Sequence, residues 1–257
     1  MEPPHLDAIR QSYDAVAADY ARSVKDPAQL DPLSRAVLAA FAELVRSADL
    51  GPTADVGCGP GKVTAYLTRL GVSAFGVDLS PRMVGLARAA HPELRFDVGS
   101  MSALEADDGE LGGVLAFYST HHLPPESLPG AYAEFHRALA PGGHLLLVTR
   151  VGDTGRQRRT YGYGGGEPAA FDSYRLPAAR IAELLERAGF VVTGRTLQEP
   201  EEGANRPVAG FLAQKPEQLK ELEEQGKPEE LEELGNPEKP EQPKRPGAPV
   251  VAPLGPS

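Results

Sequence analysis

The sequence predicts an α/β fold built on a mostly parallel sheet, and three observations carry that prediction. From residue 53 onwards, short apolar stretches alternate with stretches of helical periodicity, which is the pattern of parallel strands joined by crossover helices. A glycine-rich turn follows the first of these strands. Polar residues end several strands, and ligands of open α/β sheets bind at the carboxyl ends of strands. These strand-end residues are Asp55, Asp78, Ser100, Tyr118 and His121.

The composition fits one well-buried domain plus additional sequence. The chain has 257 residues, of which 41% are apolar, and a formal charge of -10. Because nucleic-acid binding depends on Lys and Arg that neutralise phosphates, we expect no nucleic-acid partner. The basic residues Arg156, Arg158 and Arg159 are interpreted as a solvated loop.

The single cysteine, Cys58, excludes an intrachain disulfide, which agrees with a cytoplasmic protein. The first residues lack the basic and apolar segments of a secretion signal. No apolar run approaches the roughly 18 residues of a membrane span. We therefore expect neither secretion nor a membrane location.

Two amphipathic helices are expected before the first strand. Residues 6–22 place Ile9, Tyr13, Val16 and Tyr20 at helical spacing, and a second helix is expected over 32–46. The two helices could pack across the ligand end as an N-terminal helical cap, residues 1–50. Tyr13 and Tyr20 then either close over a cofactor or pack as aromatic core residues.

The alternation predicts the remaining elements. Strands are expected to end at Asp55 and to cover 73–79, 94–98, 113–118, 145–149 and 190–197. Helices are expected over 63–70, from Ser80 onwards, and over 126–139 and 176–188.

Residues 54–64 are the first candidate for a ligand site. They read Ala-Asp-Val-Gly-Cys-Gly-Pro-Gly-Lys-Val-Thr. Glycines let the backbone approach a ligand, and the following helix offers free N–H groups. The Gly-x-Gly-x-Gly spacing differs from that of dinucleotide folds, and Asp55 suits an ammonium group rather than a pyrophosphate. We therefore expect an amino-acid moiety at Asp55, Gly57 and Gly59, although the same residues could form only a tight turn.

Asp78 is the second candidate. It ends the second strand about 20 residues beyond the glycine turn, where a carboxylate suits a bidentate hold on two ribose hydroxyls. The alternative is a role as a turn or helix N-cap residue. Ser80 and Pro81 provide an N-cap and a first helical residue for the next helix.

These motifs resemble those of the class I S-adenosylmethionine-dependent methyltransferases, particularly the bacterial small-molecule type. The resemblance covers residues from about 13 to 216. It rests on Asp-Val-Gly-Cys-Gly-Pro-Gly, Gly-Val-Asp-Leu-Ser-Pro-Arg-Met, Gly-Ser-Met-Ser-Ala-Leu, Leu-Ala-Phe-Tyr-Ser and Leu-Ala-Pro-Gly-Gly-His-Leu-Leu-Leu. It implies a Rossmann-like, seven-stranded sheet with helices on both faces, whose last strand, 207–214, lies antiparallel beside the fifth. It also implies S-adenosylmethionine as cofactor and a small-molecule methyl acceptor.

The resemblance assigns roles to individual residues. Asp55 and the glycine turn would hold the methionine end and Asp78 the ribose, while Leu79 and Met101 would sandwich the adenine. Ser100 stands where many relatives have an acidic residue near the adenine amino group. The expected cofactor-binding residues are Tyr13, Tyr20, Asp55, Gly57, Gly59, Asp78, Leu79, Met83, Gly99, Ser100, Met101 and Tyr118.

The implied reaction is an in-line attack on a sulfonium methyl group, which requires alignment and desolvation above all. An oxygen or nitrogen nucleophile would also lose a proton, and His121 or His122 is the candidate base. Alternatively, one histidine packs and the other is solvated or bonded to backbone. Tyr118 and Ser119 could line the methyl channel. Pro124 and Pro125 lack the flanking residues of the Asn-Pro-Pro-Tyr signature.

Two segments stand apart from this core, which is expected over residues 51–215. Residues 151–175 are expected to form a long glycine-rich loop, either a lid or an insertion without a role. Its aromatic residues could form a wall for a flat acceptor: Tyr161, Tyr163, Phe171 and Tyr174. Residues 216–257 are rich in Pro, Glu and Lys, which predicts a disordered tail.

Three functions are considered. The favoured one is methyl transfer to a metabolite, natural product or quinone-like acceptor. A nicotinamide-dependent oxidoreductase is disfavoured by the glycine spacing and by Asp55. A protein that binds the cofactor without catalysis stays open, because a fold and a cofactor site do not establish turnover.

Overall fold

A seven-stranded sheet, in the order β3-β2-β1-β4-β5-β9-β8, forms the centre of the protein. The computed structural model describes residues 4–161, 163, 169–199 and 207–217. Within these residues, β9 is antiparallel to both β5 and β8, and the other pairings of the sheet are parallel. The predicted fold class, including the antiparallel last strand beside the fifth, is confirmed.

The strands and helices alternate along the chain as predicted. The strands are β1 (Thr53–Val56), β2 (Ala74–Asp78), β3 (Phe96–Val98), β4 (Leu111–Phe117), β5 (Leu139–Arg150), β6 (Gly155–Tyr161), β7 (Ala169–Arg175), β8 (Val191–Gln198) and β9 (Val208–Gln214). The α-helices are α1 (Pro4–Ser23), α2 (Pro32–Ala48), α3 (Lys62–Arg69), α4 (Pro81–Ala90), α5 (Leu128–Ala138) and α6 (Ala178–Arg187). Three short 3-10 helices are η1 (Pro27–Gln29), η2 (Thr120–His122) and η3 (Pro125–Ser127).

Local capping explains where α2 and α4 begin. The Asp31 carboxylate accepts the backbone N–H of Ser34 at 2.9 Å, and Pro32 opens α2. The Ser80 hydroxyl accepts the N–H of Met83 at 3.1 Å, and Pro81 opens α4. The predicted helix start at Ser80 and Pro81 is therefore confirmed.

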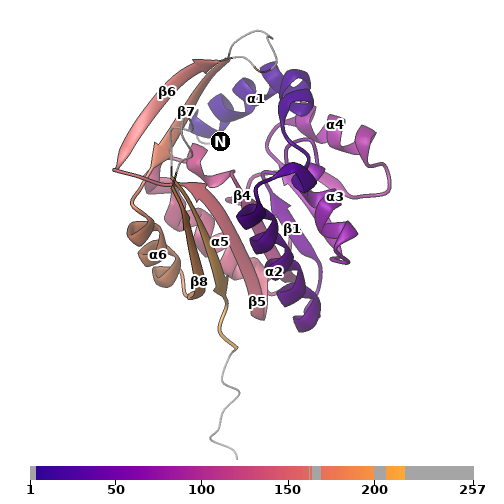
Figure 1. Ribbon diagram of the computed structural model, residues 1–257, viewed down its shortest axis with the longest axis vertical. Coiled ribbons are helices and arrows are strands. Elements are labelled where there is room, and N and C mark those ends of the chain that lie inside the picture. Colours follow the sequence, from indigo (N-terminus) through magenta and orange to yellow (C-terminus); the bar gives the residue numbers. More distant parts are fainter. Residues whose placement is uncertain (1–3, 162, 164–168, 200–206, 218–257) are drawn as a thin grey trace, which may run out of the picture. The chain divides into compact units, whose positions relative to one another are not determined.

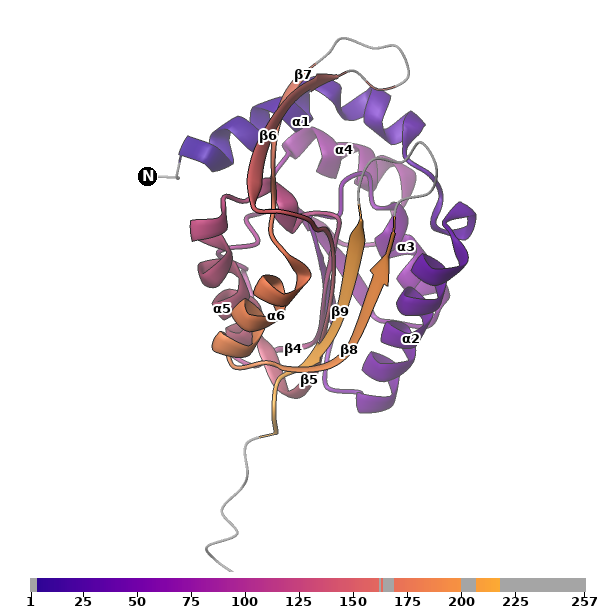
Figure 2. The same cartoon turned by 60° about the vertical axis from the view of Figure 1, so that its left-hand side comes forward.

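Helices cover both faces of the sheet, as Figure 2 shows for α5 and α6 on one side and α2 and α3 on the other. Because successive side chains of a strand point to opposite faces, Leu145 and Leu147 of β5 join the cluster under α5 and α6. Leu146 and Val148 join the cluster under α2 and α3. Both faces of the central strands are thus buried, as is usual for parallel strands.

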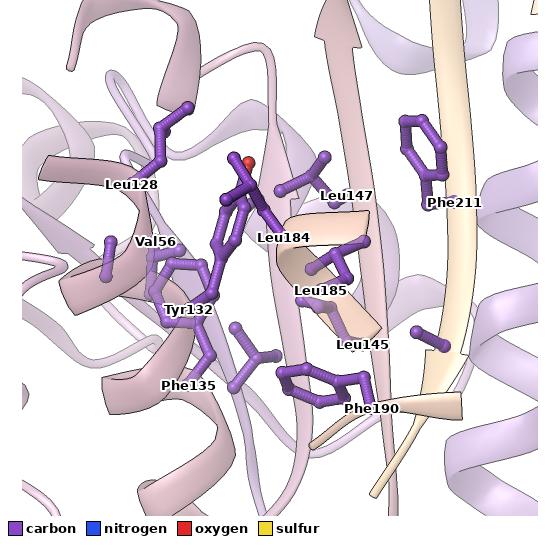
Figure 3. Packing of buried hydrophobic residues seen from close by; sticks show 14 of the residues in the cluster. Val56, Leu128, Tyr132, Phe135, Leu145, Leu147, Leu184, Leu185, Phe190 and Phe211 are labelled. Atoms are coloured by element: carbon purple, nitrogen blue, oxygen red, sulfur yellow. The ribbon is translucent and has the colours of Figure 1, made fainter. Parts of the chain in front are cut away.

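The larger cluster lies between α5, α6 and the sheet. Figure 3 shows Tyr132 and Phe135 of α5 beside Leu184 and Leu185 of α6. The side chains of Tyr132, Phe135 and Leu185 are fully buried. This packing fixes β4 and β5, whose carboxyl ends reach the candidate site.

Only α1 of the two N-terminal helices caps the carboxyl edge of the sheet (Figures 1 and 2). The side chain of Asp14 accepts hydrogen bonds from the Ser80 hydroxyl and from the N–H of Arg82, and the Ser12 hydroxyl donates to the carbonyl of Ala170. The expectation that the second helix also packs across this edge is wrong. Its stripe of Val37, Leu38, Phe41, Ala42 and Val45 is buried against the sheet face instead.

The predicted loop over 151–175 is also wrong for most of its length. Residues of β6 and β7 form a two-stranded antiparallel ladder from Gly155 with Arg175 to Tyr161 with Ala169. Phe171 and Ser173 of β7 are buried, whereas the described side chains of β6 are exposed or half-buried. The buried side of β7 therefore packs against the rest of the protein and stabilises the ladder. The glycine-rich centre of the segment, residues 164–168, lies outside the described residues.

Other expectations need smaller corrections. Arg156 and Arg158 lie on β6 rather than on a loop, and both form ion pairs with Asp172. The fifth strand begins at Leu139, which pairs with Leu111 before the ladder shifts register, so the Pro-Gly-Gly segment interrupts β5 instead of preceding it.

The predicted tail, residues 216–257, lies outside the described residues from 218 onwards. Among the helices that are described, none is both long and apolar enough to cross a membrane.

The packing under α5 predicts a large loss of stability on truncation of Phe135. Phe135→Ala removes a fully buried ring, so we expect the free energy of unfolding to fall by about 3–5 kcal/mol. Urea denaturation at neutral pH measures this change. Leu197→Ala, at a position where the side chain is 58% exposed, is the control and should change the value by less than about 0.5 kcal/mol. Equal losses in the two variants would contradict this description of the core.

Candidate functional site

Two adjoining hollows lie at the carboxyl edge of the sheet. The first contains about 700 Å³ of empty space, which includes the open solvent at its mouth. Tyr20, Gly57, Gly59, Phe117 and Tyr118 line both hollows, so the two share a wall. The first hollow is lined by Leu6, Ile9, Tyr13, Tyr20, Gly57, Gly59, Asp78, Leu79, Met83, Gly99, Ser100, Met101, Phe117, Tyr118, Ser119, His122 and Leu123.

Eleven of the twelve expected cofactor-binding residues therefore line the first hollow, and Asp55 is the exception. Asp55 lines the second hollow, on the other side of the shared glycine wall.

The glycine turn brings backbone close to the end of β4. Gly57 has φ +77°, and a Cβ added to it would lie 2.3 Å from the Cβ of Ser119. Gly59 has φ +54°, and a Cβ added to it would lie 3.6 Å from the ring of Tyr20. A side chain at residue 57 could not fit without displacing Ser119, and side chains at either position would adopt a disfavoured conformation.

Asp78 links the glycine turn to the start of α4. Its Oδ2 accepts the N–H of Gly59 at 2.8 Å and its Oδ1 accepts the N–H of Ser80 at 2.9 Å. The carboxylate is partly open to the first hollow, and burial raises its pKa. Ser80 provides the N-cap of α4, so the alternative role of Asp78 as that N-cap does not apply.

Asp55 lies at the end of β1 with a side chain that is almost fully buried. Its Oδ2 accepts a hydrogen bond from the Thr64 hydroxyl at 2.7 Å. Burial, with a smaller contribution from the nearby Asp78 charge, raises the pKa of Asp55 to about 7. A cationic group placed beside it would stabilise the carboxylate form.

One face of α1 covers the first hollow. Leu6, Ile9, Tyr13 and Tyr20 are spaced by three, four and seven residues, which puts them on the same side of a helix. The sequence prediction selected the two tyrosines and missed Leu6 and Ile9, although the same helical spacing would have included them. The rings of Tyr13 and Tyr20 contact each other edge to face, with centroids 5.8 Å apart.

The expected aromatic wall is only partly present. Phe171 contacts Tyr13 and Tyr163 contacts Tyr20, both edge to face. Tyr174 lines cavities outside the two hollows, and the side chain of Tyr161 lies outside the described residues.

Tyr118 stands on the wall between the two hollows. Its backbone has φ +55°, a conformation that residues other than glycine rarely adopt, and its N–H donates to the carbonyl of Val148 at 2.8 Å. The unusual backbone turns the chain sharply at the end of β4. Ser119 and η2 follow directly, which brings His122 to the first hollow.

His122 is held on both ring nitrogens. Its Nδ1 lies 2.8 Å from the carbonyl oxygen of Asp172, and its Nε2 lies 2.6 Å from the hydroxyl of Tyr13. Because a carbonyl only accepts, Nδ1 carries the proton, and Nε2 accepts from Tyr13. Burial lowers the pKa of His122 to about 4, so the ring is neutral at neutral pH.

His121 does not reach either hollow. Its ring is buried and lines a separate small cavity with Thr120, Tyr132 and Tyr174. The two imidazole rings lie against each other, with centroids 4.1 Å apart, but they line different cavities. Of the two predicted bases, only His122 is placed beside the first hollow.

The second hollow carries cationic residues that sequence reasoning missed. Lys25, Lys62 and Arg150 line it, together with Asp55. Lys62 lies within the glycine-rich stretch 54–64 but was given no role there, and Lys25 belongs to no motif. Arg150 ends a strand at a position that has no distinctive pattern in the sequence. The ammonium of Lys62 donates to the carbonyl of Val24 at 2.7 Å, which ties α3 to the end of the α1 segment.

Comparisons with known proteins agree with this architecture. A methyltransferase domain model matches residues 54–143. An uncharacterized methyltransferase from Synechocystis is 28% identical over 168 residues, which cover 60% of this chain and 76% of the relative. A 2-heptyl-1-hydroxyquinolin-4(1H)-one methyltransferase from Mycobacteroides abscessus is 30% identical over 38% of this chain and 45% of its own length. The match to the second relative therefore spans less than half of that protein.

Solved structures show the same fold. The crystal structure of magnesium protoporphyrin IX methyltransferase from Synechocystis with bound S-adenosylmethionine has a TM-score of 0.61 and 17% identity, over 83% of this chain and 98% of that chain. Residues 54–143 thus match a methyltransferase domain, and the fold of the chain is the one found in structures of S-adenosylmethionine-dependent methyltransferases.

The buried carboxyl of Asp55 predicts an unusual pH dependence of stability. Its pKa is about 7 in the folded protein, above its ordinary value of 3.8, so the folded state binds this proton more tightly than the unfolded state. The stabilisation is complete below about pH 4 and is lost as the pH rises towards 7. Between pH 5 and pH 7, the difference in unfolding free energy between the wild type and Asp55→Asn should fall by up to about 1.4 kcal/mol per pH unit. Urea denaturation of both proteins at several pH values measures it, and parallel pH profiles would contradict the raised pKa.

Proposed function

We propose that the protein transfers the methyl group of S-adenosylmethionine to a small-molecule acceptor that enters the site through the second hollow. The observation that carries the proposal is the shared glycine wall, with Asp78 on one side and Asp55 on the other. A nucleoside can contact one side and an amino-acid end the other. The open second hollow leaves room for a second molecule.

The expected roles of the site residues fit this arrangement. Asp78 would hold the ribose hydroxyls, while Leu79, Met83, Gly99, Ser100 and Met101 would surround the adenine. Asp55, Gly57 and Gly59 would hold the methionine end, with Tyr13, Tyr20 and Tyr118 closing the site. The cofactor supplies an electrophilic methyl group on a sulfonium, and the protein supplies alignment and exclusion of water.

Tyr13 and His122 offer a route for a proton. In this proposal, an acceptor hydroxyl gives its proton to the Tyr13 oxygen while the Tyr13 proton passes to Nε2 of His122. The resulting imidazolium keeps its Nδ1–H bond to the carbonyl of Asp172. Because His122 is a weak base with a pKa of about 4, this route suits an acceptor whose own proton is acidic.

The aromatic residues around the shared wall favour a flat acceptor. Tyr20, Phe117 and Tyr118 line both hollows. Two related proteins are named for flat ring systems, a hydroxyquinolone and a magnesium porphyrin. A flat metabolite or natural product is therefore the acceptor class that we propose.

The proposal also covers location and domain division. The single cysteine and the acidic charge support a cytoplasmic location without a nucleic-acid partner. We also propose the division into an N-terminal cap and a core over 51–215. For the cap, α1 supports this division, whereas α2 packs with the core.

Binding of S-adenosylhomocysteine tests the cofactor assignment. Asp78→Asn should weaken its binding by about 10- to 100-fold, because a hydrogen bond to a charged group contributes about 1.5–3 kcal/mol. Calorimetry with the wild type and the variant measures this. Asp97→Asn is the control, because Asp97 lies on the neighbouring strand, pairs with Arg95 and lines neither hollow.

An unchanged affinity in Asp78→Asn would remove the proposed ribose contact. Binding of NADH in place of S-adenosylhomocysteine by the wild type would instead revive the oxidoreductase hypothesis.

The proton route predicts a separation of kcat from cofactor binding. With an acceptor identified by screening, Tyr13→Phe should lower kcat by about 100-fold or more, because it removes the hydroxyl but keeps the ring. His122→Gln should lower kcat similarly, and S-adenosylhomocysteine should bind both variants within about threefold of the wild type. Radiolabelled methyl transfer measures kcat, and Tyr174→Phe, outside the hollows, is the control. If the Tyr13→Phe variant has the same kcat as the wild type, the proposed proton transfer through Tyr13 to His122 is wrong.

A further inference from the structure

The second hollow carries an excess of positive charge. Lys25, Lys62 and Arg150 line it, and Asp55 is its only acidic residue among the described residues. Burial raises the pKa of Asp55 to about 7, so this carboxyl offsets only part of the positive charge near neutral pH. The excess is notable because the whole chain has a formal charge of -10.

Of the three cations in the second hollow, Arg150 is the one best placed to pair with an anionic ligand. It is partly buried at the carboxyl end of β5, and in the described part of the chain its guanidinium has no ion-pair or hydrogen-bond partner. Arg137, Arg156 and Arg158 all meet carboxylates. Lys62 already donates to the carbonyl of Val24, and Lys25 is exposed. A half-buried guanidinium that faces a hollow can pair with an anion there at a smaller cost in lost hydration than a fully exposed one.

The cofactor itself would not remove this excess. The amino-acid end of S-adenosylmethionine carries one ammonium and one carboxylate, so it adds no net charge to the hollow. Its sulfonium adds a further positive charge. One cofactor carboxylate can pair with only part of the three cations, so an excess of positive charge stays in the second hollow for another molecule.

We propose that Arg150 binds a carboxylate of the methyl acceptor, so that the acceptors of this enzyme are flat carboxylic acids. This inference rests on the proposed function of the same site. The planar guanidinium pairs with a carboxylate through two parallel hydrogen bonds, which fixes the orientation of the acceptor as well as its charge.

The neighbours of Arg150 suit such an acceptor. Phe117 and Tyr118 line the hollow beside it and offer apolar faces to a ring. Tyr118 and Arg150 lie at the ends of adjacent strands, because Tyr118 donates to the carbonyl of Val148. Tyr118 lines both hollows, so a ring packed beside it in the second hollow lies at the wall shared with the first hollow.

A matched pair of probes tests this inference. Protein saturated with S-adenosylhomocysteine is titrated calorimetrically with 2-naphthoate and with its neutral counterpart 2-naphthamide. We expect the wild type to bind 2-naphthoate about 10- to 100-fold more tightly, the range that charge-assisted hydrogen bonds provide. Arg150→Gln should bring the two affinities to within about threefold, and Arg150→Lys should keep part of the preference. Arg195→Gln, on the edge strand β8, is the control and should keep all of it.

Each other outcome identifies what is wrong. If the wild type does not bind S-adenosylhomocysteine, the proposed function fails. If that ligand binds but 2-naphthoate shows no preference over 2-naphthamide, or no binding at millimolar concentration, the carboxylate site is overturned while the cofactor site stands. If Arg150→Gln weakens S-adenosylhomocysteine as much as 2-naphthoate, Arg150 serves the cofactor and the inference is overturned. A preference that survives in Arg150→Gln overturns it as well.

Discussion

The carboxylate of Asp78 is the interaction on which the candidate site depends. It accepts one N–H from the glycine turn and one from the start of α4, so a single side chain sets the distance between these two segments. Ser80, the next residue but one, caps α4 and also donates to Asp14 of α1. The turn, the helix and the cap are thus connected through three consecutive polar contacts. All three would shift together if Asp78 were lost.

Charge divides the site into two halves with different tasks. The first hollow contains Asp78 and no Lys or Arg, whereas the second has three cations and a carboxyl that is easily protonated. The glycine turn forms the wall between them, because Gly57 and Gly59 have no side chains and their backbone lines both hollows. In our proposal, a molecule with a neutral nucleoside end and a zwitterionic end lies across the wall, and the remaining positive charge is left for its reaction partner.

Most of the fold could be predicted from the sequence because its signals are local. Strand and helix periods, the Ser80-Pro81 helix start and the glycine turn each act within a few residues, and the structure keeps all of them. The hairpin of β6 and β7 could not be predicted in this way. Its stability comes from contacts with α1 and from the pairing of Arg156 with Asp172, both of which require the folded chain. Arg150 was missed because the absence of a partner is a property of the tertiary structure. His121 and His122 have the same local signal in the sequence, and only the folded structure shows that His122 alone lines the first hollow.

The left-handed backbone of Tyr118 is a local strain that the packing of its ring outweighs. Such a conformation costs an L-residue about 1 kcal/mol relative to glycine, and the hydrogen bond to Val148 holds it in place. Glycine would relieve the strain but would remove a ring that packs on the buried cluster under α2 and contacts Phe117 edge to face. The lost burial of an aromatic ring outweighs about 1 kcal/mol of backbone strain. Laboratory selection for thermal tolerance alone should therefore retain an aromatic residue here, and the partition between the two hollows would be kept without any selection for ligand binding.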